Sequence, residues 1–170
     1  MEIERLEPSL AANERETLSA FLDFQRATLA LKCQGLTSTQ AAMQSVPPST
    51  LSLVGMVRHL TDVETAWFVE RFAGEQAQYL FRGGEDPNAA FNDAADADLE
   101  ESLQQWSDAC ARSRAILVRV DTLDQLSVGV RRENQHFSMR WLLEHLMAEY
   151  ARHNGHADFL REVIDGVVGR

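Results

Sequence analysis

The segment LLEHLMAEYARHNGHADFLREVIDG, residues 142–166, decides the fold, because its apolar residues recur at the spacing of an amphipathic helix. Each residue of an ideal helix advances by about 100°, so with Glu149 at zero Leu146 lies at about 60°. Ser138 before the segment is a favoured N-cap, and Gly166 after Asp165 is a favoured helix stop. The sequence therefore predicts a long helix that buries a leucine-rich face. Six polar residues are expected on its opposite, exposed face: Arg140, Glu144, Asn154, Asp158, Arg161 and Asp165.

Three further segments have helical periodicity, and the alternating apolar runs that strands need do not occur. Between the second and third segments, residues 75–97 indicate a long surface crossover, punctuated by Gly83-Gly84 and Asp86-Pro87-Asn88. We therefore predict an all-α four-helix bundle with a long crossover between helices two and three, in which residues 1–170 form a single domain. The three predicted helices run from Asn13 to near Gly35, from a cap at Ser49 or Thr50 to Phe72 before Gly74, and from Asp98 to about Val120.

The charge balance restricts the partners. The chain has 16 basic and 26 acidic residues, a net charge of −10, which argues against binding to nucleic acid or to anionic membranes. No apolar run is long enough for a transmembrane helix, and Cys33 and Cys110 have neither the number nor the spacing of a disulfide scaffold. We expect a cytoplasmic protein whose cysteines are reduced core residues. An apolar stripe on the first helix makes a homodimer reasonable.

Glu149 and His153 lie on the leucine-rich face of the last helix, about 40° apart. A carboxylate in an apolar stripe is costly unless it is protonated, paired with a buried arginine or bound to a metal ion. Its partner one turn later is a histidine, and neutral imidazole is a common ligand of transition metals. An internal salt bridge between the two residues is the alternative.

The second helix carries a similar anomaly at His59. With His59 at zero, Val63 lies at about 40° and Ala66 at about −20°, so this histidine points with small and apolar residues. If helices two and four pack side by side, His59 can meet Glu149 and His153. Two histidines and one carboxylate with open positions are the ligand set of a catalytic zinc site, which also suits iron or nickel. Taken alone, a histidine on an apolar face such as His59 is more often a hydrogen-bonded core histidine than a metal ligand.

Other residues are candidates for supporting roles. His156, at about −20° from Glu149, could donate to a ligand or orient a substrate. Asp62, at about −60° from His59, could supply a fourth ligand, as His156 also could. Candidate walls of a substrate pocket are Met56, Val63 and Trp67, with Leu146 and Tyr150 opposite.

The two histidine-bearing segments, SLVGMVRHLTDVETAWF (52–68) and LLEHLMAEYARHNGHADFLREVIDG (142–166), resemble the DinB/YfiT-like superfamily. Within it, the chain is most similar to an actinobacterial group related to mycothiol-dependent maleylpyruvate isomerase and S-transferases. The resemblance implies a bundle that holds a divalent metal ion, with one ligand on helix two and two more, four residues apart, on helix four. By position these ligands fall on His59, Glu149 and His153. Many members have two histidines on helix four, and the His/Glu/His set looks like the isomerase branch.

Together these observations predict a metal-dependent enzyme of the thiol transferase or isomerase type. A divalent ion, zinc or nickel, would activate a low-molecular-weight thiol such as mycothiol for transfer to, or isomerisation of, a small electrophilic substrate. The alternative is a non-catalytic metal-binding or stress-response helical module.

Overall fold

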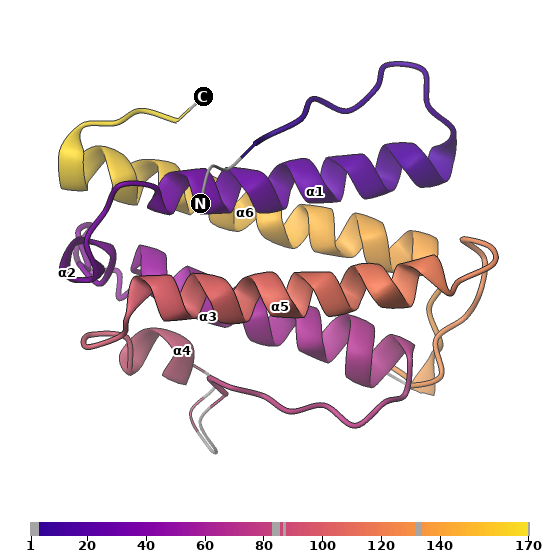
Figure 1. Ribbon diagram of the computed structural model, residues 1–170. Coiled ribbons are helices and arrows are strands. Elements are labelled where there is room, and N and C mark those ends of the chain that lie inside the picture. Colours follow the sequence, from indigo (N-terminus) through magenta and orange to yellow (C-terminus); the bar gives the residue numbers. More distant parts are fainter. Residues whose placement is uncertain (1–3, 83–85, 87, 132–133, 170) are drawn as a thin grey trace.

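The computed structural model describes residues 4–82, 86, 88–131 and 134–169. Four long helical elements form a bundle (Figure 1). They are α1 (Glu14–Cys33), α3 (Leu53–Glu64) continued directly by the π-helix η1 (Thr65–Phe72), α5 (Leu99–Val118) and α6 (Met139–Asp165). The short helices α2 (Ser38–Ala41) and α4 (Ala89–Asn92) lie in the connections.

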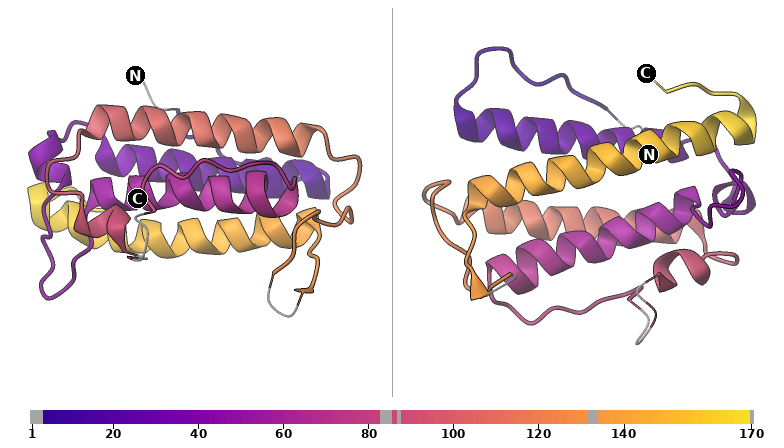
Figure 2. Two further views of the ribbon diagram at one scale, coloured as in Figure 1. Left: turned by 90° about the horizontal axis from the view of Figure 1, so that it is seen from below. Right: turned by 180° about the vertical axis from the view of Figure 1, so that it is seen from behind.

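The bundle has the predicted crossover. In Figure 1, α1 and α6 run in one direction, α3–η1 and α5 run in the other, and the chain after η1 returns along the bundle to the start of α5. Seen from behind, α6 lies between α1 and α3, and it contacts both (Figure 2, right). The all-α bundle with a long connection between its second and third helices is therefore confirmed. The predicted punctuation at Gly83-Gly84 and at Pro87 lies outside the described residues.

Side-chain caps define most helix ends as the sequence predicts. The side chains of Asn13, Asp98 and Ser138 each accept a hydrogen bond from a backbone N–H three residues later, and Gly166 ends α6 in the left-handed conformation with φ 80°. The predicted cap at Ser49 or Thr50 is wrong. Ser52 caps α3 instead, because Ser49 belongs to the preceding turn and its hydroxyl accepts from the Leu51 N–H.

The prediction that Asn154 and Arg161 are exposed is also wrong, because α1 packs against this side of α6. Asn154 donates to the carbonyl and side chain of Gln25 at 3.0 and 2.7 Å. Arg161 donates to the carbonyls of Lys32 and Gln34 at 2.9 and 2.8 Å. Arg161 thus satisfies carbonyls at the end of α1 that have no partner within the helix.

A buried ion pair lies in the middle of the bundle. Arg26 of α1 forms two hydrogen bonds with Glu64 of α3, at 2.8 and 2.7 Å, and Glu64 has no exposed surface. The hydroxyl of Tyr150 donates to Glu64 at 2.8 Å and accepts from the indole of Trp106 at 2.9 Å. These four residues, Arg26, Glu64, Trp106 and Tyr150, are called the core network below. The network joins α1, α3, α5 and α6.

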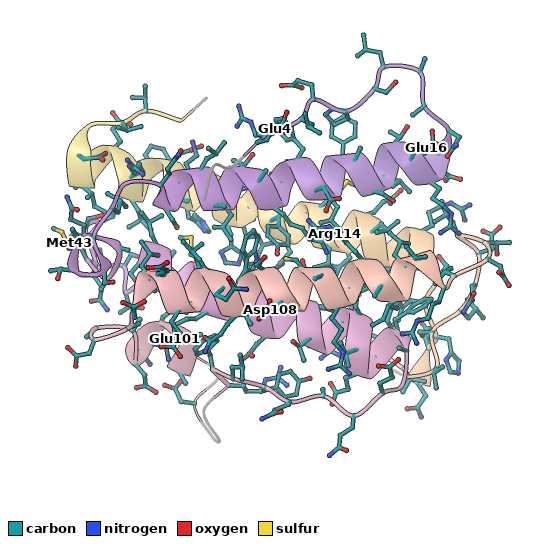
Figure 3. All side chains as sticks on the ribbon, in the orientation of Figure 1. Glu4, Glu16, Met43, Glu101, Asp108 and Arg114 are labelled. Atoms are coloured by element: carbon teal, nitrogen blue, oxygen red, sulfur yellow. The ribbon has the colours of Figure 1, made fainter. Side chains whose placement is uncertain are left out.

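The outer surface is charged, as the acidic composition requires. Figure 3 shows Glu101 and Asp108 on the outer side of α5 and Glu16 near the start of α1, and all three are exposed. Cys33 and Cys110 are free and buried, as expected for core residues. In the part of the chain that the structure describes, no helix combines the length and the apolar character needed to cross a membrane.

Candidate metal centre

His59 of α3 and the Glu149–His153 pair of α6 converge where these two helices pack. One ligand atom from each residue can be chosen so that all three atoms lie within 4.8 Å of one another. The Nε2 atoms of His59 and His153 lie 3.5 and 3.4 Å from the same carboxylate oxygen of Glu149. The three side chains named by the sequence analysis therefore form one cluster.

Local packing holds the two histidine rings in place. The ring of His59 lies 4.8 Å from that of His153 and 5.5 Å from that of Phe91 in α4, measured between centroids. Phe91 reaches this position because α4 packs closely on α3 at Gly55, where an added Cβ would lie 2.8 Å from the Phe91 ring. The short helix in the crossover thus helps to fix the orientation of His59.

Glu149 lies at the edge of the buried face of α6. Its side chain is 24% exposed, so the expected position in the middle of the buried stripe is wrong. The imidazoles of His153 and His59 hold the pKa of Glu149 far below its usual range, although partial burial opposes this shift. The carboxylate is therefore ionised at neutral pH and can serve as a ligand.

The donor atoms fit a small divalent ion. His59 Nε2 is buried and has no hydrogen-bond partner among the described residues, and it faces the same carboxylate oxygen of Glu149 as His153 Nε2 does. The 3.4 and 3.5 Å separations from the carboxylate oxygen exceed the usual N–H···O distance of about 2.7–3.2 Å. They are close to the ~3.3–3.4 Å edge of a tetrahedron with zinc–ligand bonds of about 2.0–2.1 Å. The cluster is thus spaced as ligands around an ion rather than as hydrogen-bonded partners.

Asp62 and His156, the two residues expected in supporting roles, lie in different surroundings. Both carboxylate oxygens of Asp62 accept backbone N–H groups, from Leu80 at 2.9 Å and from Phe81 at 3.0 Å. Asp62 therefore anchors the crossover, which corrects its expected role as a fourth ligand. His156 is exposed, with its ring 5.7 Å from that of His153, and partial burial with the nearby charge of His153 lowers its pKa.

A hollow of about 120 Å³ opens beside His59. Val63 and Trp67 line it, as the sequence analysis expected. Met56, Leu146 and Tyr150 are not among its described lining residues, because all three are fully buried in the bundle and Tyr150 belongs to the core network. Arg71, Phe81 and Arg82, which the sequence analysis missed, line the hollow instead.

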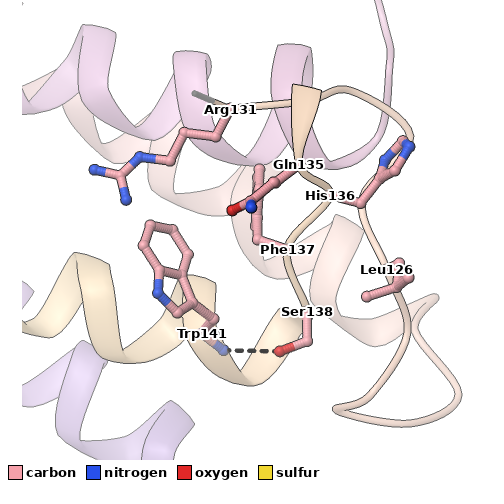
Figure 4. A pocket seen from close by; sticks show the side chains of 7 residues that line it. All are labelled: Leu126, Arg131, Gln135, His136, Phe137, Ser138 and Trp141. Carbon is pink, nitrogen blue, oxygen red and sulfur yellow. Dashed lines mark hydrogen bonds between the residues drawn. The ribbon is translucent and has the colours of Figure 1, made fainter. Parts of the chain in front are cut away.

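Two further hollows have lining residues in common with this one or with each other. Trp67 and Arg71 also line a hollow of about 420 Å³ together with Arg131, and Arg131 in turn lines one of about 550 Å³ with Trp141. Figure 4 shows Arg131 and Trp141 on the same side of the larger hollow, with Leu126 and His136 on the other. Shared residues thus connect the surroundings of His59 to the loop before α6.

A comparison with protein families gives a match to the mycothiol-S-transferase family over residues 17–166. The match includes all three residues of the candidate metal centre, and it confirms the resemblance to a mycothiol-related group of DinB-like proteins. No curated protein matches this chain.

Proposed function

Because the chain belongs to the mycothiol-S-transferase family, we propose that it transfers a low-molecular-weight thiol, mycothiol or a close analogue, to a small electrophile. The observation that carries the proposal is the cluster of His59, Glu149 and His153, in which the buried Nε2 atom of His59 lacks a partner among the described residues. We further propose that these three residues hold a divalent ion, zinc or nickel.

The ion would supply one kind of chemistry: a bound divalent metal lowers the pKa of a thiol, so that the nucleophilic thiolate exists at neutral pH. Three protein ligands leave room for an exogenous ligand, whereas structural zinc sites have four protein ligands. This ligand count supports a catalytic role over a purely structural one.

The chain's own residues account for access and orientation. His59 lines the hollow that contains Val63 and Trp67, so a thiol entering there meets the cluster from the side of α3 and the crossover. In the transfer, the thiol loses its proton, its sulfur forms a bond to the electrophilic carbon, and the leaving group departs with the bonding electron pair. The buried wall of α3 and α6 keeps the opposite side of the cluster closed to water.

Metal content tests the first part of the proposal. Protein purified without a histidine tag is expected to hold about one divalent ion per chain by mass spectrometry of the metal. The His59→Ala, Glu149→Ala, His153→Ala triple variant is expected to hold none, and Glu144→Gln, an exposed glutamate on the same helix, retains the wild-type content. Equal metal in the triple variant would overturn the assignment of the ligands.

Thiol transfer tests the second part. We expect the metal-loaded protein to accelerate the reaction of mycothiol with an activated aryl chloride, and the triple variant to show only the uncatalysed rate. Metal binding without acceleration of any thiol reaction would favour the alternative, a metal-binding module without catalysis.

A further inference from the structure

An arginine–tryptophan wall lies beside the candidate metal centre. It consists of Trp67, Arg71, Arg131 and Trp141. The guanidinium of Arg71 lies 4.4 Å from the ring of Trp67, and that of Arg131 lies 5.4 Å from Trp67 and 4.7 Å from Trp141. The ring of His145 joins the two indoles, 4.3 Å from Trp67 and stacked 4.8 Å from Trp141.

The π-helix η1 turns part of this wall toward His59. In a continuous α-helix with His59 at zero, Trp67 would lie at about 80° and Arg71 at about 120°. A π-helix has about 4.4 residues per turn, which after Glu64 places Trp67 at about 30° and Arg71 at about 0°. Both residues accordingly line the hollow that contains His59.

A close backbone contact holds Arg131 in its place in the wall. The N–H groups of Val128 and Gly129 donate to the carbonyls of Phe72 and Arg71, both at 2.8 Å. A Cβ atom on Gly129 would lie 2.7 Å from the Arg71 carbonyl oxygen, so only glycine allows this approach. The loop before α6 is thus docked on the end of η1, and Arg131 follows two residues later.

No described carboxylate neutralises the two guanidinium groups of the wall. Among the described residues, neither Arg71 nor Arg131 forms an ion pair with a carboxylate, although nine arginine–carboxylate or lysine–carboxylate pairs occur elsewhere in the described part of this acidic chain. The nearby carboxylate of Asp62 is bound to two backbone N–H groups, and that of Glu70 accepts from Tyr79. Burial lowers the pKa of His145, so its ring adds a neutral surface and not another cation.

We propose that the arginine–tryptophan wall is the binding site for the acceptor, and that the acceptor is a small organic carboxylate. Guanidinium groups pair with a carboxylate through parallel hydrogen bonds, and the indoles beneath Arg71 and Arg131 hold both guanidinium groups in place through cation–π contacts. This inference rests on the proposed thiol transfer for the acceptor's reaction, but binding of the carboxylate needs neither the metal nor the thiol.

The binding test uses the three tryptophans as separate reporters. Benzoate is titrated into the ¹⁵N-labelled protein and compared with benzamide, its neutral counterpart. We expect the indole N–H signals of Trp67 and Trp141 to shift with benzoate at least several-fold more than with benzamide. Trp106, whose indole donates to Tyr150 in the core, is expected to stay unchanged. Equal shifts with both compounds, or no shift of Trp67 and Trp141, would overturn the proposal.

The kinetic test compares 4-chloro-3,5-dinitrobenzoate with its carboxamide as acceptors. The thiol sulfur forms a bond to the ring carbon, chloride leaves with the electron pair, and the thiol proton passes to the buffer. We expect Arg71→Gln and Arg131→Gln each to raise KM for the carboxylate about tenfold and to change KM for the carboxamide less than twofold, since each substitution removes a charge-assisted hydrogen bond that only the carboxylate can accept. Arg152→Gln, an exposed arginine on α6 outside the wall, is the matched control.

The two proposals fail in different ways. The acceptor site is supported, whether or not transfer occurs, by two results together. The Arg71→Gln, Arg131→Gln double variant should lose the benzoate shifts, and the triple variant of the metal ligands should still bind benzoate. If transfer proceeds with the same KM for the carboxylate and for the carboxamide, the acceptor site is overturned and the proposed function still stands.

Discussion

Two polar clusters of the molecule both involve α3 and α6, and they differ in how completely their polar groups are hydrogen-bonded. In the core network, Glu64 receives two hydrogen bonds from Arg26 and one from Tyr150, and it has no exposed surface. In the candidate metal centre, Glu149 is partly exposed, and the buried Nε2 atom of His59 has no described partner. Buried polar groups are normally hydrogen-bonded, so the complete cluster indicates a structural role, and the incomplete one indicates a site for a ligand.

The largest effect should come from the complete cluster. Glu64→Gln removes the fully buried counter-charge of Arg26 and leaves it only the partly exposed carboxylate of Asp23 at 2.9 Å, and we expect the free energy of unfolding to fall by about 3–5 kcal/mol in chemical denaturation. The Arg26→Met, Glu64→Leu double variant should recover much of this loss, because it removes both charges together. A loss below about 1 kcal/mol in Glu64→Gln would show that the network contributes little to stability.

The incomplete cluster should respond in the opposite way. We expect Glu149→Gln to weaken metal binding by at least about a hundredfold, measured by competition with a chromogenic chelator, since a carboxylate ligand is replaced by a neutral amide. Its free energy of unfolding without metal should change by less than about 1 kcal/mol, because Glu149 is partly exposed. A large loss of metal-free stability would place Glu149 with Glu64 as a structural residue.

Acid should bring the stabilities of the wild type and of Glu64→Gln closer together. Burial raises the pKa of Glu64, but the charge and hydrogen bonds of Arg26 lower it further, so the net pKa lies below its usual value. The stabilisation by ionised Glu64 is therefore complete above the unfolded pKa of about 4.3 and is lost as the pH falls through the lowered folded pKa. In denaturation curves, the stability difference between wild type and Glu64→Gln should be constant near pH 7 and shrink below about pH 4.3. A difference independent of pH would contradict the ionised state of Glu64.

The smallest effect should come from Tyr150, the member of the core network that follows Glu149 directly in α6. Tyr150→Phe removes the hydroxyl that bridges Trp106 and Glu64, and we expect a loss of about 1–2 kcal/mol in the free energy of unfolding. Metal content and thiol transfer should not change, because the hydroxyl points away from the hollow beside His59. A lower rate of thiol transfer in Tyr150→Phe, at unchanged metal content, would show that Tyr150 belongs to the substrate pocket.

Much of the fold follows from local signals in the sequence. Asn13, Asp98, Ser138 and Gly166 define helix ends through caps that depend on a few neighbouring residues, and their positions were predicted correctly. The burial of Arg161 could not be predicted in this way, because it depends on the end of α1, more than a hundred residues away.

The two clusters were predictable to different degrees. The convergence of His59 with Glu149 and His153 follows from helical periodicity once α3 and α6 are taken as neighbours. Glu64 was missed, although the same arithmetic places it at about 140° from His59, between Leu60 at about 100° and Phe68 at about 180°. Arg71 was not predictable, because its position depends on the π-helical winding of η1, which the periodicity of an α-helix does not reveal.

The winding of η1 has a consequence for the evolution of such chains. A helix that holds more residues per turn tolerates the removal of one of them by reverting to the ordinary α form. A homologue one residue shorter in this stretch would keep its bundle and its His/Glu/His cluster, yet present different side chains at the entrance. Selectivity between acceptors could then change through a single deletion, without any substitution among the ligands.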